Sequence, residues 1–91
     1  MIVFAVIATE TPAPKLASAI TQKFPDNKSL QIAQTAWLVS ADETSKGVSD
    51  SLGITTGETE AAVVIANAGY YGRASTHIWE WIKREIENRG G

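Results

Sequence analysis

The sequence contains no cysteine, which excludes disulfides and any metal site built from thiolates. It contains a single histidine, His77, so a histidine-rich metal site is excluded and carboxylates would have to supply the other ligands of any metal ion. His77 stands early in a predicted helix. We therefore expect it to be an ordinary surface or interface residue.

The chain also lacks an excess of basic residues. Eight lysines and arginines stand against ten aspartates and glutamates, which gives the 91 residues a formal net charge of −2. Proteins that bind nucleic acid usually carry a basic excess, because neutralising phosphates supplies much of their affinity. Nucleic acid is therefore not favoured as a partner. Lys83, Arg84 and Arg89 form a local basic group. A solvated helix face is predicted for it, because three glutamates are interleaved with these residues: Glu80, Glu85 and Glu87.

No apolar run is long enough to cross a bilayer. The longest, at residues 2–8, falls far short of the roughly 20 residues that a spanning helix needs. No basic segment precedes it, so it is predicted to be a strand rather than a signal peptide. Apolar residues make up 44% of the chain and charged residues 20%, as in ordinary globular proteins. The sequence thus predicts one cytoplasmic domain over residues 1–91 without membrane association.

Apolar runs and turn residues predict seven elements. The expected order is strand, helix, strand, strand, helix, strand and terminal helix, with the strands at residues 2–8, 30–32, 35–40 and 61–66. The first and last of these strands are apolar at every position, which predicts burial on both faces. Gly53 followed by Ile54 predicts a left-handed cap at the end of the second helix, and Gly57 is the expected tip of the next loop.

This order predicts an α+β fold with a ferredoxin-like βαββαβ core over residues 1–67 and an additional C-terminal helix at about 75–88. The first and third strands would be central neighbours, and the first two helices would cover one face of the sheet. The other face would also be apolar, so the tryptophan-rich terminal helix or a second copy of the chain has to cover it. We therefore expect a homodimer. The three tryptophans are expected to anchor the core and interfaces.

Glu10 is the candidate catalytic residue because it follows the end of the first strand. In a dimer two copies of Glu10, helped by Thr9 or Thr11, could converge and offer the oxygen ligands that Mg²⁺ prefers. The alternative is a carboxylate at a helix start, where the helix dipole favours negative charge. Apart from this arrangement the sequence predicts no metal site.

The loop at residues 67–73 has the most unusual composition. Two glycines free its backbone, Tyr70 and Tyr71 offer stacking faces, and Arg73 precedes a helix. These residues could hold an anion through backbone N–H groups and the guanidinium, or stack a base. The alternative, which we favour, is that Tyr70 and Tyr71 pack against the terminal helix while the glycines make the turn.

Three segments form a pattern seen in a known family: Thr35-Ala36-Trp37-Leu38-Val39, Gly69-Tyr70-Tyr71-Gly72 and Trp79-Glu80-Trp81-Ile82-Lys83. With them the chain, over residues 1–88, resembles the small proteins of the SinR family, which are similar to CRISPR-associated ferredoxin-like nucleases and to the VapD toxin ribonucleases. The resemblance implies a ferredoxin-like homodimer, commonly bacterial or phage-borne. The nuclease relatives keep a metal-binding aspartate at the end of the first strand. This chain has Ala8-Thr9-Glu10 there and no aspartate before Asp26.

The leading hypothesis is a non-catalytic dimeric interaction module without a cofactor, because the strand-end aspartate is missing, histidine is scarce and the charge is balanced. The alternative is a Mg²⁺-dependent RNA or DNA nuclease that uses pairs of Glu10, with Arg73, Lys83 or Arg84 on phosphate. A third hypothesis is a small-molecule sensor with its pocket at the Tyr70–Tyr71 loop.

Overall fold

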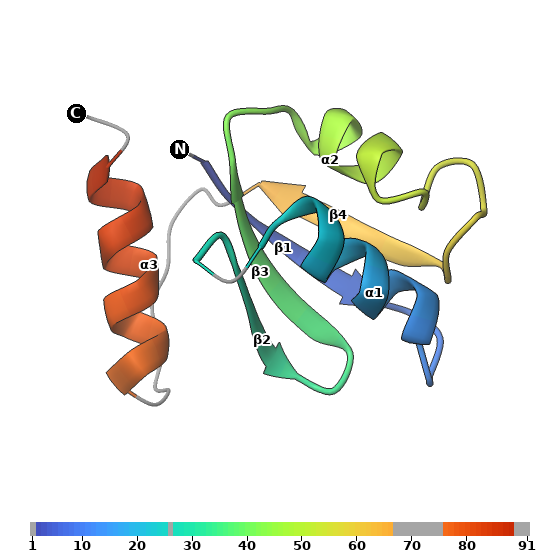
Figure 1. Ribbon diagram of the computed structural model, residues 1–91, viewed down its shortest axis with the longest axis horizontal. Coiled ribbons are helices and arrows are strands. Elements are labelled where there is room, and N and C mark those ends of the chain that lie inside the picture. Colours follow the sequence, from blue (N-terminus) through green and yellow to red (C-terminus); the bar gives the residue numbers. More distant parts are fainter. Residues whose placement is uncertain (1, 26, 67–75, 89–91) are drawn as a thin grey trace.

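A computed structural model describes residues 2–25, 27–66 and 76–88, which form a four-stranded antiparallel sheet and three helices (Figure 1). The strands are β1 (Ile2–Ala8), β2 (Ser29–Ala33), β3 (Ala36–Ala41) and β4 (Ala62–Ala66). The helices are α1 (Pro14–Lys23), α2 (Ser45–Ser51) and α3 (Thr76–Asn88). The chain is α+β, and the predicted order of its elements is confirmed.

The strands lie in the order β2-β3-β1-β4, so β1 and β3 are central and β2 and β4 form the edges. All neighbouring strands are antiparallel, and Phe4 of β1 lies opposite Val39 of β3 and Ala66 of β4. A strand with neighbours on both sides and layers on both faces is apolar throughout, which accounts for the composition of β1.

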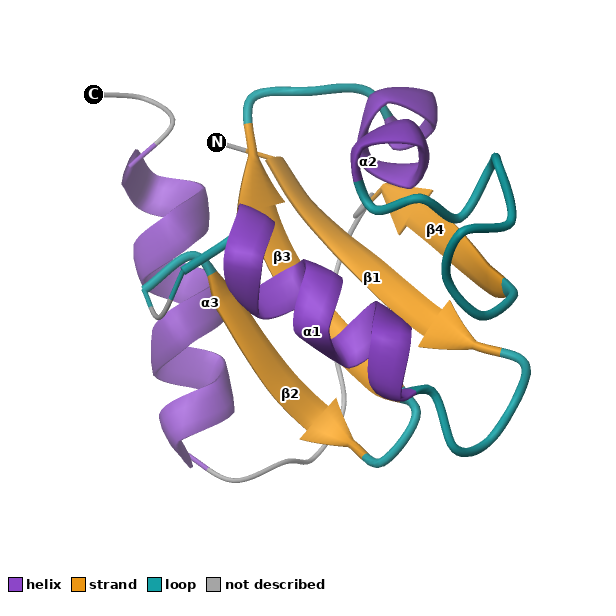
Figure 2. Cartoon of the chain, turned by 45° about the vertical axis from the view of Figure 1, so that its right-hand side comes forward, coloured by secondary structure: helices purple, strands orange, loops and turns teal. Residues whose placement is uncertain are grey.

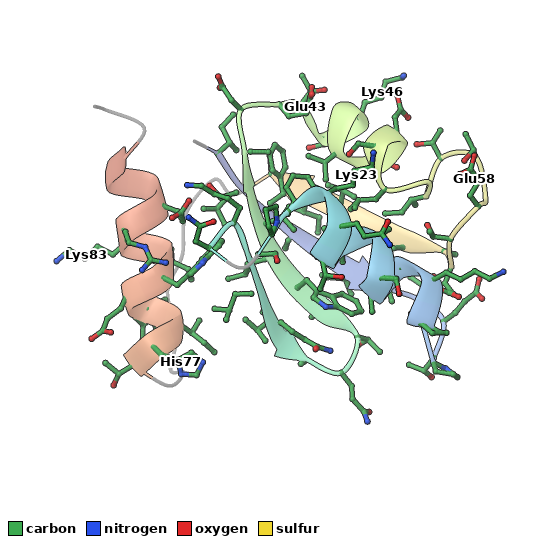
Figure 3. All side chains as sticks on the ribbon, in the orientation of Figure 1. Lys23, Glu43, Lys46, Glu58, His77 and Lys83 are labelled. Carbon is green, nitrogen blue, oxygen red and sulfur yellow. The ribbon has the colours of Figure 1, made fainter. Side chains whose placement is uncertain are left out.

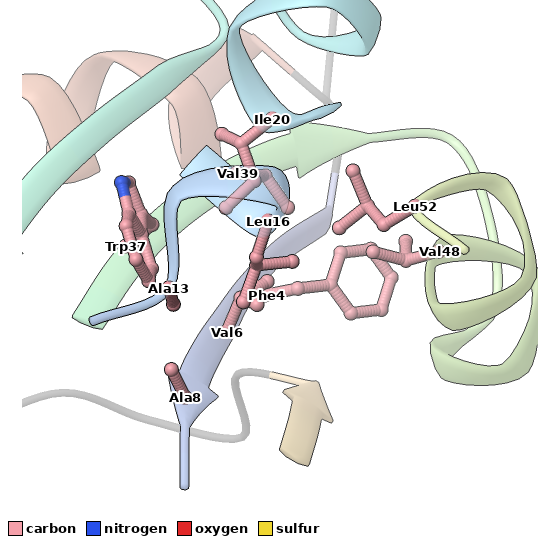
Figure 4. Close-up of a cluster of buried hydrophobic side chains, with 10 residues drawn as sticks. All are labelled: Phe4, Val6, Ala8, Ala13, Leu16, Ile20, Trp37, Val39, Val48 and Leu52. Carbon is pink, nitrogen blue, oxygen red and sulfur yellow. The ribbon is translucent and has the colours of Figure 1, made fainter. Parts of the chain in front are cut away.

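Helices α1 and α2 cover one face of the sheet (Figure 2). Pro14 opens α1, where the missing N–H of proline costs nothing. Leu16 and Ile20, one turn apart, point inward and are fully buried. They belong to the main core, which Figure 4 draws with these members: Phe4, Val6, Ala8, Ala13, Leu16, Ile20, Trp37, Val39, Val48 and Leu52.

The second helix ends at the glycine cap that its sequence predicts, and a threonine caps its start. The Thr44 hydroxyl accepts a hydrogen bond from the Gly47 N–H at 3.0 Å, which caps α2. After α2, Gly53 adopts φ 76° and the Ile54 N–H donates to the Ser49 carbonyl at 3.0 Å. This left-handed backbone favours glycine and reverses the chain out of the helix.

Helix α3 packs on the opposite face of the sheet (Figure 2). Trp81 and Ile82 are buried there against Val3 of β1 and Leu38 of β3. The terminal helix therefore supplies part of the cover that the second apolar face requires. Trp37 and Trp81 are core residues, as expected.

The prediction that Glu85 lies on a solvated helix face is wrong. Glu85 is only 2% exposed, and its Oε1 lies 2.9 Å from Nζ of Lys28, just before β2. Its other oxygen lies 3.5 Å from Nε of Arg84. The reason is helical spacing: Glu85 stands seven residues after Ile78, on the same buried stripe. An ion pair thus joins α3 to the chain segment that leads into the edge strand.

The pKa of Glu85 reflects two opposed effects. Burial raises the pKa, but the hydrogen bond from Lys28 and that residue's charge outweigh it, so the pKa lies below its ordinary value. The Ser40 hydroxyl also lowers the pKa from nearby, although it makes no hydrogen bond of ordinary geometry. The pair is a stabilising contact that needs the ionised carboxylate.

We expect Glu85→Gln to lower the free energy of unfolding at neutral pH by about 2 kcal/mol, because a buried hydrogen bond between charged groups is lost. Since the folded pKa is depressed, the contribution is complete above the ordinary value of 4.5 and disappears as pH falls through the folded value. Urea unfolding at a series of pH values measures this. Glu80→Gln, at an exposed position of the same helix, is the control. An acid dependence unchanged by Glu85→Gln would contradict the assignment.

Gly53→Ala and Gly57→Ala separate backbone strain from crowding. Both glycines have positive φ, so alanine at either position costs about 1 kcal/mol. A Cβ on Gly57 meets open space, whereas one on Gly53 lies 3.2 Å from Cβ of Glu58. We therefore expect Gly53→Ala to be the more destabilising, by about 2 kcal/mol in total, in thermal or urea unfolding. Equal losses of unfolding free energy in the two variants would contradict this prediction, because they would show that the contact with Glu58 is relieved without cost.

Candidate functional site

The prediction that the strand at residues 61–66 is buried on both faces is wrong. β4 forms as predicted, but Val63 is 48% and Ile65 is 51% exposed. The cluster under α3 draws its members from β1, β2, β3 and α3, so the helix leaves β4 uncovered. An unbroken apolar run reads the same in an edge strand and in a central one, so the sequence contains no signal for this difference.

Three exposed apolar side chains lie together on the face of the sheet that α3 covers in part. In the register of β1 and β4, Ile7 is opposite Val63, and Ala5 is opposite Ile65. Ile7 is 38% exposed, although β1 is otherwise largely buried. We call Ile7, Val63 and Ile65 the open apolar face. It continues the buried cluster of α3 across the sheet toward the free edge.

The edge itself is unprotected. Within the described residues β4 pairs only with β1, so the outer backbone groups of β4 have no strand partner. The strand reads Ala-Val-Val-Ile-Ala, without charge, proline or bulge. Edge strands in soluble proteins usually carry such features because they prevent pairing with another chain. The edge and the open apolar face together form a surface suited to another β-strand.

Glu10 lies in the loop after β1, where its carboxylate accepts a hydrogen bond from the Ala61 N–H at 3.2 Å. The Thr9 N–H donates to the Ala61 carbonyl at 2.9 Å. These bonds join the end of β1 to the start of β4. As a candidate catalytic residue Glu10 stays a prediction.

The carboxylate that caps α1 is Glu60. It accepts from the N–H of Leu16 at 2.8 Å and of Lys15 at 3.4 Å. Burial raises the pKa of Glu60, but the backbone N–H groups, led by that of Leu16, outweigh it and the pKa is lowered. Leu16 and Glu60 stand 44 residues apart, so local sequence rules for helix caps could not identify this pair.

A polar hollow of about 260 Å³ lies at this corner, lined by Glu10, Lys15, Glu58 and Glu60 among others. Lys15 places a positive charge among the three carboxylates. In the part of the chain that the structure describes, no three histidine or acidic side chains are grouped so as to hold a metal ion. Of the site residues predicted from the sequence, Glu10 is the one found among the described residues that line this hollow.

The remaining candidates lie elsewhere. Tyr70, Tyr71 and Arg73 fall outside the described residues. Lys83 and Arg84 are exposed on α3, and Lys83 points away from the sheet (Figure 3). α3 and the loop between β1 and α1 lie on opposite sides of the molecule (Figure 1). The structure therefore does not bring Lys83 or Arg84 to Glu10.

Among the described helices none is both long and apolar enough to span a membrane.

Comparisons with known proteins gave no match among family models, curated proteins or solved structures. The function of this chain therefore has to be argued from its own residues.

Proposed function

We propose that this chain is a non-catalytic interaction module with a ferredoxin-like core, which works as a homodimer paired through β4. The observation that carries the proposal is the open apolar face beside an unprotected strand edge. The order of the first six elements and the strand order β2-β3-β1-β4 support the ferredoxin-like core.

The sequence of β4 suits pairing with itself. In an antiparallel pair with Val64 on a twofold axis, each Val63 would lie opposite Ile65 of the other copy. Both side chains belong to the open apolar face, so the pairing would join the two faces across the axis. Cross-strand pairs of β-branched residues stabilise such a contact, and small alanines would lie at both ends. A second copy would therefore supply hydrogen-bond partners for the outer backbone groups of β4 and would bury its exposed side chains.

This geometry would keep the two copies of Glu10 apart. Glu10 is bonded to Ala61, three residues from Val64, so the two copies would be separated along the paired strands by roughly 20 Å. Carboxylates that share a metal ion have to lie within a few ångströms of it. The proposed dimer thus does not assemble the Glu10 pair on which the nuclease hypothesis depends.

We expect the unmodified chain to sediment as a dimer at micromolar concentration and Ile65→Lys to sediment as a 9.8 kDa monomer. The change puts a charge opposite Val63 of the other copy, within the joined apolar faces, which should raise the dissociation constant at least about 100-fold. The matched control is Ile32→Lys on the opposite edge strand β2, where the isoleucine is 40% exposed. That variant should remain dimeric.

Sedimentation of the unmodified chain as a monomer at micromolar concentration would contradict the proposed dimer. Dissociation caused by Ile32→Lys but not by Ile65→Lys would move the interface to β2. Circular dichroism of both variants checks that the fold is retained, since both positions are solvent-facing in the single chain.

The non-catalytic assignment predicts that labelled RNA and DNA stay intact with Mg²⁺ or Mn²⁺, and that Glu10→Ala behaves as the unmodified chain does. Gel electrophoresis of the labelled strands is the measurement. Glu43→Ala, at another exposed glutamate, is the matched control. Cleavage that persists in Glu43→Ala and is lost in Glu10→Ala would establish the nuclease instead.

A further inference from the structure

The two layers that cover the sheet differ in what they bury. The core under α1 and α2 is built from apolar side chains, and its members include Phe4, Leu16 and Ile20. The layer under α3 also takes up the carboxylate of Glu85 and the hydroxyl of Ser40, each residue being 2% exposed. Among the residues that the structure describes, these two are the buried polar or charged ones. The polar groups that folding removes from water are therefore gathered under one helix.

Two polar atoms in this layer have no hydrogen-bond partner. Ser40 is opposite Val3 in the register of β1 and β3 and stands two positions after Leu38, so its side chain is on the face that α3 covers. Trp81 of α3 is packed in the same cluster as Val3 and Leu38. Oγ of Ser40 and Nε1 of Trp81 are both buried, and in the described part of the chain they are the buried side-chain atoms without a partner.

These groups weaken the docking of α3. A buried donor or acceptor without a partner keeps the full cost of leaving water, and release of α3 would hydrate both Ser40 and Trp81 again. The ion pair of Glu85 opposes release, but a buried pair recovers little beyond the cost of desolvating its charges. The core under α1 and α2 is the larger one (Figure 4). The apolar gain that holds α3 comes from a smaller buried set: Val3, Leu38, Trp81 and Ile82.

The elements that precede α3 pack around a core of their own, to which no described residue of α3 belongs. That core therefore stays intact when α3 is removed. Ala5 connects the two apolar regions of the other face, because it packs in the cluster under α3 and lies opposite Ile65 of β4. Without α3, Val3 and Leu38 would join the open apolar face.

We propose that α3 is a releasable cover, which leaves the sheet as a unit while the four strands, α1 and α2 stay folded. The released state presents one apolar face that runs from Leu30 of β2 to Val63 of β4. Regions that open before global unfolding are those with few buried apolar contacts, as found under α3. No described residue of β4 belongs to the cluster under α3, so the proposal does not depend on the homodimer.

The test is native-state hydrogen exchange of the ¹⁵N-labelled chain, followed by NMR at a series of low urea concentrations. We expect the backbone amides of Trp81, Ile82 and Glu85 to exchange at least about tenfold faster than those of β1 and β3. Their exchange should also depend less on urea, because release of one helix exposes less surface than global unfolding does. A single urea dependence shared by α3 and the central strands would overturn the proposal, since helix and sheet would then open only together.

Two variants separate release of α3 from global unfolding. Leu16→Ala weakens the core under α1 and α2, which stays formed in the released state. It should speed exchange in β1 and β3 at least about tenfold and leave exchange in α3 unchanged. Ile82→Ala weakens the docking of α3 and should speed exchange in that helix at least about tenfold. Ile20→Val, a smaller change in the same core as Leu16, replaces Leu16→Ala if that variant does not fold.

The variants also give the results that would overturn the proposal. Equal acceleration of α3 and β1 by Leu16→Ala would place the helix and the sheet in one cooperative unit. Exchange in α3 that ignores Ile82→Ala would come from fluctuations of a docked helix. Ile65→Lys, which disrupts the proposed dimer, should leave exchange in α3 unchanged. A monomeric chain would thus contradict the dimer without affecting the release of α3.

Discussion

A sheet that is apolar on both faces has to be covered twice, and this constraint organises the whole chain. Helices α1 and α2 close one face over the main core. Among the described residues the other face is covered by α3, which packs over β1, β2 and β3 and leaves β4 open. Exposed valine and isoleucine side chains gain free energy from burial, so the uncovered end of this face is where a partner would bind.

Contacts between residues that are far apart in the sequence hold several elements together, and local sequence rules do not predict these contacts. Glu60 caps α1 by accepting from the N–H of Leu16, 44 residues before it, and Lys28 pairs with Glu85 across 57 residues. Both carboxylates have lowered pKa values because hydrogen bonds outweigh the cost of burial. Trp81 and Ile82 pack α3 against the sheet, and the ion pair between Glu85 and Lys28 joins the helix to the segment that leads into β2.

The exposed edge of the sheet differs in kind from its covered faces. β4 offers backbone hydrogen bonds and apolar side chains, which suit pairing with another strand.

Residue order alone determined the succession of strands and helices and the left-handed Gly53, because each depends on neighbours within a few positions. Only the tertiary structure decided that β4 is exposed, that Glu85 is buried and that Glu60 caps α1. A run of valine and isoleucine looks the same at an edge and in the centre, and a carboxylate tolerates burial only where a distant lysine reaches it.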